Sequence, residues 1–360
     1  MKYIYLTLSI LMITSCKTKM GHNLTSTHDK QIVSNFTKVE LTTIVEEATL
    51  NVRALEIIKE KNVVVFLSSL GDLGVFNIEK NELKYPLEIE ADSIKPNFRS
   101  LSARNSAGFG MSIASPAKLY RLDNNADKTK IVYQENHEKA FYDSLEFWND
   151  KEGIAIGDPT DDCMSIIITR NGGETWEKLD CNVLPKSLEG EAAFAASDSN
   201  IAIVGDKTWV ATGGKASRIL FSPDKGKTWS VYNTSIVQGL ETTGIYSIDF
   251  YDDLNGFGIG GDYTLPEQNE ANKIRSIDGG KTWQLVAQNQ NPGYRSCVKY
   301  VPNSNAQQLV AVGFNGIDYS KDAGNTWQHL SDEGFYTIRF LNDSIAFAGG
   351  NGKVSKLVFK

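Results

Sequence analysis

One octapeptide occurs four times in the chain, at residues 169–176, 222–229, 276–283 and 320–327, and each copy reads Ser/Thr-x-Asp/Asn-x-Gly-x-Thr-Trp. The third side chain can accept hydrogen bonds from backbone N–H groups in a turn, the glycine can adopt a positive φ, and the first hydroxyl can bind the turn to the incoming strand. The tryptophan can anchor the turn by burying its ring. The pattern therefore predicts four equivalent hairpin turns. Their third and last residues are Asn171 and Trp176, Asp224 and Trp229, Asp278 and Trp283, and Asp322 and Trp327.

The spacing of the octapeptides matches a repeating unit of four strands. Their third residues are 53, 54 and 44 residues apart, which is the length range of one propeller blade. An alternating apolar run and then a short strand of small residues precede each copy, at 142–147 and 153–157, 192–196 and 201–205, 246–250 and 256–260, and 295–300 and 309–313. We interpret these runs as the first two strands of a blade, with the octapeptide between the third and fourth strands.

The same pair of strands is found outside the octapeptide region, at 52–57 with 63–67, 98–101 with 108–112, and 335–340 with 345–349. Seven units result, so we predict an all-β fold: a seven-bladed β-propeller of four-stranded antiparallel blades. Six or eight blades remain possible, because the first two units match the pattern weakly. The last unit is one strand short, and a surplus strand at 36–42 can supply it. We therefore expect the N- and C-terminal strands to close the ring.

The first residues have the features of a targeting segment. An apolar stretch at 3–13 is too short to span a bilayer and ends in Ile13-Thr14-Ser15-Cys16. This sequence resembles a bacterial lipobox, which implies cleavage before Cys16 and acylation of its thiol; an ordinary secretory signal is the alternative. The chain then divides into a lipoprotein signal peptide (1–15), a flexible tether (16–35) and the propeller (36–360). Since residue 17 is not acidic, the resemblance implies a lipid anchor in the outer membrane of the bacterial cell envelope, facing either the periplasm or the exterior.

The cysteines and charges limit the chemistry. Cys163 and Cys181 flank the hairpin that turns at 171–173, so we expect them to form a disulfide in an oxidising compartment. Cys297 lies in an alternating apolar run and is expected to be a buried, unreactive thiol. The four histidines are scattered, and we predict neither a metal site nor a cofactor. A net charge of −7 argues against a nucleic-acid partner.

The octapeptide is similar to the Asp-box of BNR repeats, which occurs in sialidases, sortilin-type receptors and photosystem II assembly-factor-like proteins. The chain most resembles the photosystem II assembly/stability factor-like family, through the Thr-Trp ending of each box and a Gly-Asp after the second strand, at 157–158, 205–206 and 261–262. That resemblance implies a monomeric binding or assembly scaffold without catalysis. The boxes are then structural, because a calcium site needs more converging oxygen atoms than one box offers.

We expect the binding site on the face opposite the octapeptides. Alignment of the first strands places Arg53, Arg99 and Arg295 at the channel mouth, where they are predicted to converge on an anionic group of a protein or glycan partner. Alternatively, each arginine pairs with a neighbouring carboxylate, Asp143 or Glu191. Trp209 lies in a polar stretch, and either forms an exposed platform for the partner or packs over its own loop.

The second candidate function is a sialidase-type glycoside hydrolase that uses an arginine triad. Phe98-Arg99 resembles the start of the Phe-Arg-Ile-Pro motif of sialidases, but Ser100-Leu101 replaces its Ile-Pro. The resemblance implies a tyrosine nucleophile with a glutamate and an acid/base aspartate. The candidates are Tyr336 or Tyr246, Glu191 and Asp143. An enzyme needs a tyrosine–glutamate hydrogen bond beside the arginines, whereas a scaffold does not.

Overall fold

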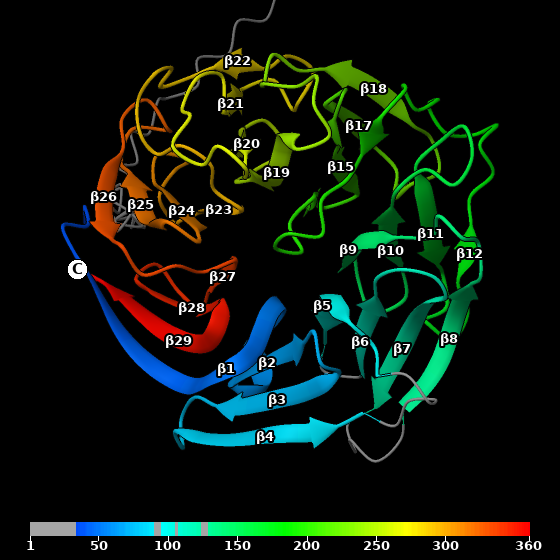
Figure 1. The fold of residues 1–360 in the computed structure, drawn as a ribbon, viewed down its shortest axis with the longest axis horizontal. Coiled ribbons are helices and arrows are strands. Elements are labelled where there is room, and N and C mark those ends of the chain that lie inside the picture. The colour runs from blue at the N-terminus through cyan, green and yellow to red at the C-terminus, as the bar shows by residue number, and fades with distance from the viewer. Residues whose placement is uncertain (1–33, 90–94, 105–106, 124–128) are drawn as a thin grey trace, which may run out of the picture. The chain divides into compact units, whose positions relative to one another are not determined.

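The computed structural model describes residues 34–89, 95–104, 107–123 and 129–360. The predicted signal peptide, Cys16 and most of the tether lie outside these residues. The described chain forms 29 strands and one 3-10 turn, and the strands belong to six antiparallel sheets arranged around a ring (Figure 1). The all-β prediction is confirmed. No helix among the described residues has the length and apolar character needed to cross a membrane.

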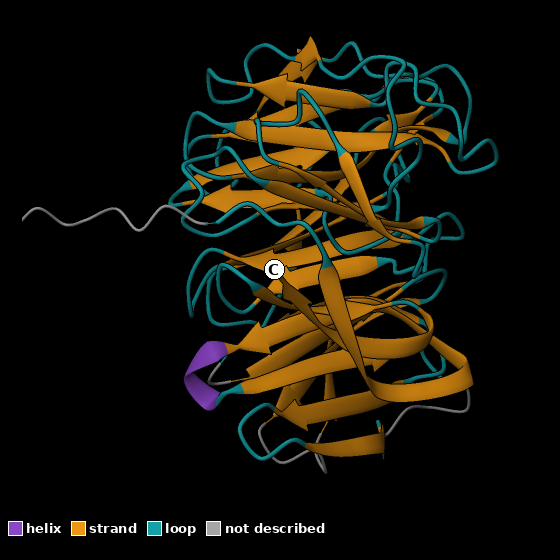
Figure 2. Ribbon diagram, turned by 90° about the vertical axis from the view of Figure 1, so that its left-hand side faces the viewer, coloured by secondary structure: helices purple, strands orange, loops and turns teal. Residues whose placement is uncertain are grey.

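Four of the sheets are four-stranded meanders, in which strands that follow one another in the chain pair side by side. The first two contain β5 (Phe98–Ala103), β6 (Ala107–Ser112), β7 (Ala117–Asp123) and β8 (Thr129–Glu135), and β9 (Tyr142–Phe147), β10 (Gly153–Gly157), β11 (Ser165–Thr169) and β12 (Glu177–Lys178). The other two contain β14 (Ile201–Val204), β15 (Lys207–Ala211), β17 (Arg218–Ser222) and β18 (Ser230–Asn233), and β23 (Cys297–Tyr300), β24 (Leu309–Gly313), β25 (Gly316–Ser320) and β26 (Gln328–Ser331). The strands run between two faces of the ring, where the loops lie (Figure 2).

Two sheets are larger. The six-stranded sheet has the order β13-β16-β19-β20-β21-β22, and the seven-stranded sheet has the order β27-β28-β29-β1-β2-β3-β4. The strands of the six-stranded sheet are β13 (Glu191–Ala192), β16 (Gly213–Gly214), β19 (Thr243–Phe250), β20 (Gly256–Asp262), β21 (Lys273–Ser276) and β22 (Gln284–Leu285). Those of the seven-stranded sheet are β1 (Val39–Ile58), β2 (Val63–Ser68), β3 (Asp72–Asn77), β4 (Glu82–Glu88), β27 (Thr337–Phe340), β28 (Ile345–Gly349) and β29 (Asn351–Phe359).

Strand β1 links the two ends of the described chain. Its residues 39–51 pair with β29 and its residues 52–58 pair with β2. The sequence predicted two separate strands here, at 36–42 and 52–57. Instead, one strand of 20 residues continues through irregular register between Glu46 and Val52. The pairing of β1 with β29 leaves no unpaired strand edge at the junction.

The four octapeptides form the predicted hairpin turns, each between the last two strands, in chain order, of its sheet. In the copy at 222–229, Ser222 Oγ accepts a hydrogen bond from the backbone N–H of Gly226, and the Asp224 carboxylate accepts bonds from the N–H and hydroxyl of Thr228. The indole N–H of Trp229 donates to the Gly226 carbonyl at 3.2 Å. The copies that begin at Ser276 and Ser320 repeat these contacts.

Each turn also packs against the preceding sheet. The glycine at the fifth position has a positive φ, and a Cβ placed on it would lie 2.1–2.6 Å from a core side chain of that sheet. The glycines and the side chains they face are Gly173 and Phe109, Gly226 and Ile168, Gly280 and Trp209, and Gly324 and Phe257. The turn tryptophans pack in the same layer; Trp176, for example, lies edge-on to Phe109 and Phe147. The octapeptides therefore join neighbouring sheets as well as reversing the chain.

Residues 193–200, which we call the central segment, depart from the prediction. The sequence placed the first strand of a blade at 192–196 and the second at 201–205. In the structure, β14 at 201–204 is the first strand of its sheet and β15 is the second. The central segment instead binds the inner strands of the other sheets. Its hydrogen bonds reach Arg53 in β1, Leu101 in β5, Leu145 in β9, Ser247 in β19, Cys297 in β23 and Thr337 in β27.

Candidate functional site

A cavity of about 530 Å³ lies over the central segment. The segment itself contributes residues 193–196 to the lining, and the inner strands and the loops next to them contribute arginine and aromatic side chains. Because residues 196–200 are hydrogen-bonded to inner strands around the ring, the segment forms a fixed floor. We call this space the arginine cavity. Its lining includes two arginines and several aromatic side chains: Arg53, Arg99, Phe194, Tyr246, Tyr294 and Tyr336.

Two of the three predicted arginines meet in this cavity. The guanidinium of Arg53 lies 3.7 Å above the ring of Tyr336, and its Nη1 donates to the Ala196 carbonyl at 2.9 Å. Its Nε is buried without a hydrogen-bond partner. Arg99 donates through Nε to Asn97. Burial and the neighbouring charge of Arg53 lower the pKa of Arg99 to about 10, and burial lowers the pKa of Arg53. Neither guanidinium forms an ion pair among the described residues, so both can bind an external anion.

Aromatic side chains form a wall beside the arginines. Phe194 stacks on Tyr246 with ring centroids 3.9 Å apart, and Tyr294 lies edge-on to Tyr246 at 4.8 Å. Phe314 packs against Tyr294 and is 42% exposed, while Tyr263 is 48% exposed. The cavity therefore combines cationic groups with apolar surface. This combination suits a ligand that carries both an anionic group and an apolar side chain.

Arg295 does not join the other two arginines, and the predicted triad is wrong. Its guanidinium forms a buried ion pair with Asp318, with Nε and Nη2 both 2.7 Å from Oδ2, and it also donates to the Tyr294 carbonyl. It lines a separate cavity of about 280 Å³, beside His329. Arg295 lies just before β23, and the carboxylate of Asp318, in β25 on the far side of β24, holds its side chain away from the arginine cavity.

Trp209 is not an exposed platform. It lies in β15 with 0% exposed surface, stacks on Phe250 with ring centroids 3.7 Å apart, and donates its indole N–H to the Gly279 carbonyl at 2.8 Å. The polar residues on either side of it suggested a loop. Its position is instead that of the core side chain that receives an octapeptide turn from the next sheet.

The residues proposed for catalysis do not form a sialidase-like site. The Glu191 carboxylate is bound by the guanidinium of Arg218 and the hydroxyl of Thr212. The hydroxyl of Tyr246 donates to the Thr242 carbonyl, and burial raises the pKa of Tyr246. Within the described chain, no tyrosine of the arginine cavity is hydrogen-bonded to a glutamate. The requirement set for an enzyme of this type is therefore not met.

Asp158 and Glu241 line the arginine cavity, and Asp143 interacts with Asp158. Asp143 is completely buried, and burial followed by repulsion from Asp158 raises its pKa, while a backbone hydrogen bond from Ala195 opposes the rise. Asp158 lines the arginine cavity and accepts a hydrogen bond from the Ala193 backbone N–H at 2.8 Å. Burial raises the pKa of Asp158 to about 6. Asp158 is not among the predicted site residues, although it belongs to the Gly-Asp dipeptide at 157–158, which follows a second strand.

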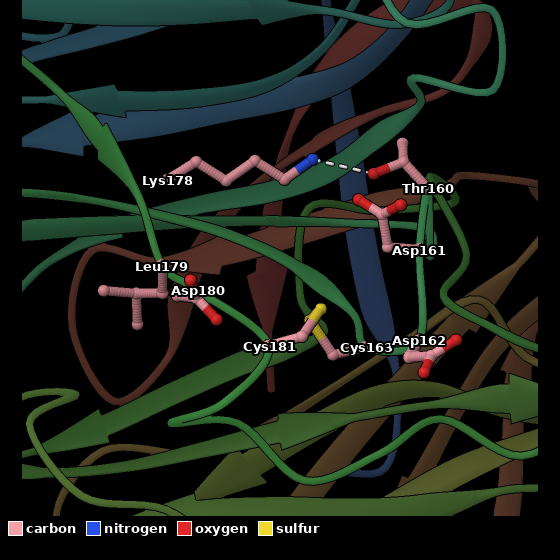
Figure 3. Close-up of a pocket in the computed structure, with 8 residues that line it drawn as sticks. All are labelled: Thr160, Asp161, Asp162, Cys163, Lys178, Leu179, Asp180 and Cys181. Atoms are coloured by element: carbon pink, nitrogen blue, oxygen red, sulfur yellow. Dashed lines mark hydrogen bonds between the residues drawn. A yellow bond between two sulfur atoms is a disulfide. The ribbon is translucent and has the colours of Figure 1, made fainter.

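The cysteines lie away from the arginine cavity. The structure contains a disulfide between Cys163 and Cys181, whose Cα atoms are 5.5 Å apart, and Cys297 is a buried free thiol. The disulfide lines a further cavity of about 580 Å³, in which Lys178 extends to the hydroxyl of Thr160 (Figure 3). Among the described residues, no group of three or more histidine, cysteine, aspartate or glutamate side chains is placed to hold a metal ion.

Neither a family model nor a curated protein sequence matches this chain. Solved structures do match it in fold. YCF48 from Cyanidioschyzon merolae has a TM-score of 0.65 at 12% identity, over 89% of this chain and 98% of that one. A structure of YCF48 bound to a D1 peptide has a TM-score of 0.63 at 13% identity, over 91% of this chain and 99% of that one. The GH74 enzyme of Niastella koreensis has a TM-score of 0.62 at 12% identity, over 87% of this chain but 53% of the enzyme. These likenesses support a β-propeller fold for the chain.

Proposed function

We propose that the protein is a non-catalytic scaffold that binds a segment of a protein partner in the arginine cavity. The observation that carries this proposal is the pair of guanidinium groups, Arg53 and Arg99, which lack carboxylate partners and stand beside an aromatic wall. They suit a carboxylate of the partner, and the aromatic rings suit a neighbouring apolar side chain. A similar fold, that of YCF48, has been solved with a bound peptide, which supports this reading.

Selection of peptides tests the proposal directly. A phage-displayed library of random peptides is selected on the full protein, and enriched sequences are expected to contain an acidic residue or to depend on a free terminal carboxylate. Arg53→Gln and Arg99→Gln each remove one charged donor, and each should weaken a selected synthetic peptide by about tenfold or more, since a hydrogen bond to a charged group contributes about 1.5–3 kcal/mol. Binding is measured by calorimetry or fluorescence anisotropy.

Arg295→Gln is the matched control. It removes the same group at the position that the sequence aligns with Arg53 and Arg99, but outside the arginine cavity. It is therefore expected to lower the melting temperature and to leave peptide affinity unchanged in the folded fraction. No enrichment of peptides, or equal affinity for wild type and both cavity variants, would overturn the proposal. Binding of sialyllactose with the same arginine dependence would favour a glycan partner instead.

We infer seven blades from the strand pairing. If the seven-stranded sheet is divided within β1, between Asn51 and Val52, it yields two groups of four strands. One group is β27, β28, β29 and the first part of β1, and the other is the second part of β1, β2, β3 and β4. The six-stranded sheet then holds the blade β19–β22 plus the short strands β13 and β16. An experimental structure with a different number of repeats would contradict this count.

We further propose that the scaffold is held at the outer membrane of a bacterial envelope by acylation of Cys16. The support is the Ile13-Thr14-Ser15-Cys16 sequence after a short apolar stretch. Metabolic labelling with an alkyne fatty acid should mark the wild-type protein, and Cys16→Ala should lose the label. Equal labelling of both proteins would refute the anchor.

A further inference from the structure

We propose that an acidic groove beside the arginine cavity binds a basic side chain of the same partner segment, so that the site recognises a segment with an anionic group and a basic residue in a fixed order. This inference rests on the proposed function and specifies its ligand. The acidic groove is a cavity of about 600 Å³ lined by Asp158, Asp161, Asp162, Glu189 and Glu241, and by Glu191, whose carboxylate is already paired with Arg218.

The acidic groove continues from the arginine cavity. The two spaces share three lining residues, Asp158, Ala192 and Glu241. Beyond the groove, the cavity at the disulfide shares Asp161 and Asp162 with it and adds Asp180. A segment that places a carboxylate on the arginines therefore meets a negatively charged surface as soon as it leaves them.

Several of these carboxylates are available to a ligand. Asp161 and Glu241 form no ion pair in the part of the chain that the structure describes, and Asp158 accepts a hydrogen bond from a backbone N–H alone. Asp162 and Glu189 have distant lysine partners, Lys186 at 3.5 Å and Lys215 at 3.7 Å, and both acidic side chains are largely exposed. Exposed pairs of this kind contribute little and can be exchanged for a ligand.

Asp158 has a further reason to bind a cation. Burial raises the pKa of Asp158 to about 6, so its charged form is disfavoured. The neighbouring carboxyl of Asp143 is completely buried and its pKa is raised well above the usual range, so it is protonated and supplies no charge. The backbone N–H of Ala193 donates to the Asp158 carboxyl at 2.8 Å. A basic side chain beside Asp158 would stabilise the charged form of this carboxyl. Lys139 is the only basic side chain among the groove's lining residues in the described chain.

The order of charges gives the site a direction. Arg53 and Arg99 repel the basic residue of a partner, and the acidic groove repels its carboxylate. A segment of reversed order would suffer both repulsions, while a segment of the right order gains two favourable contacts. Such a pattern contributes specificity more than affinity.

The peptide selection is extended to test this. The groove variant carries Asp158→Asn, Asp161→Asn and Glu241→Gln, which remove three charges and keep the polar groups. On the wild type, enriched peptides should carry lysine or arginine on one side of the acidic residue. On the groove variant, the enrichment of basic residues should disappear while that of acidic residues remains.

Affinities of one selected peptide complete the test. The groove variant should bind it about threefold to tenfold more weakly, as one partly buried ion pair predicts. A peptide with its basic residue replaced by glutamine should bind both proteins equally. The control variant is Glu60→Gln, Glu79→Gln and Glu82→Gln, three exposed carboxylates near β2, β3 and β4, and it should behave as the wild type.

The outcomes separate this inference from the proposed function. If enriched peptides depend on Arg53 but show no basic residue, or if the groove variant binds the selected peptide as the wild type does, the acidic groove is not a subsite. If no peptide depends on Arg53, the proposed function itself fails. As a further check, Glu241→Lys should bind a peptide whose basic residue is replaced by glutamate better than the wild type does; equal binding would also count against the groove.

Discussion

The adjacent glycines of the first octapeptide give a stringent test of the role of these turns. Gly172 and Gly173 have φ values of +76° and +85°, so alanine is strained at both. This strain costs about 1–2 kcal/mol. The surroundings differ, because a Cβ at Gly172 would lie 3.2 Å from the Asp150 carbonyl oxygen, whereas a Cβ at Gly173 would lie 2.3 Å from the Phe109 ring. Gly172→Ala is therefore the control for Gly173→Ala.

The expected loss of stability follows from the short distance between a Cβ at Gly173 and the Phe109 ring. Forcing extra volume into a packed core costs typically about 1–3 kcal/mol. We expect Gly173→Ala to lower the free energy of unfolding by about 2–5 kcal/mol and Gly172→Ala by about 1–2 kcal/mol. The two variants are compared by guanidinium denaturation and by thermal melting, in which each kcal/mol corresponds to about 2 °C for a chain of this size.

A double-mutant cycle identifies the contact. Phe109→Leu shortens the side chain that faces Gly173, so the alanine should cost less in the leucine background, by about 1 kcal/mol or more. The same replacement should not change the cost of Gly172→Ala. Equal destabilisation by the two alanines, or costs that are simply additive with Phe109→Leu, would refute the view that the glycine is needed to join neighbouring sheets.

Three further predictions follow from the structure. Stability should be greatest near pH 5 and should fall toward pH 7. Burial raises the pKa of Asp158 to about 6, and burial together with the nearby charge of Glu56 raises the pKa of Glu146 to about 7, so the folded state holds protons that the unfolded chain releases. A free energy of unfolding that rises from pH 5 to pH 7, measured by denaturation, would contradict this. Trp283→Ala should cost about 3–5 kcal/mol, since it leaves a cavity against Phe250, without altering peptide affinity; a melting temperature within a degree of the wild type would show that the ring contributes nothing. Reduction of the Cys163–Cys181 disulfide should lower stability by at most about 3 kcal/mol, as chain entropy predicts for a short loop, and an unchanged denaturation midpoint under reducing conditions would count against that contribution.

The elements that could be predicted were those with strong local patterns. The octapeptide fixes its own hydrogen bonds, so the four turns and the strands beside them follow from residues that are close in sequence. The small strands before them were also found, because alternation and terminal glycines are local signals. Arg53 and Arg99 line one cavity, as their shared position at the start of a blade's first strand predicts.

The errors arose where distant residues decide the structure. The alternating apolar residues at 192–196 predict a strand. In the structure, Ser197, Asp198 and Ser199, which follow them, bind the inner strands of other sheets. These partners are distant in sequence, so no local pattern predicts them. The polar neighbours of Trp209 suggested exposure, although the next octapeptide covers it. Arg295 and Arg99 share a sequence position, but Arg295 is paired with Asp318 of β25, whereas Arg99 has no carboxylate partner among the described residues.

The pairing of β1 with β29 has a consequence for the order of synthesis. Strand β29 follows every other described strand in the chain. During translation, the first half of β1 therefore cannot pair until almost all of the described residues have been made. Closing a loop of that length is entropically costly and slow compared with forming a local meander. A ribosome that stalls early would release a chain with an open strand edge, which proteases and chaperones can recognise. The junction thus couples synthesis of β29 to protection of β1 from degradation.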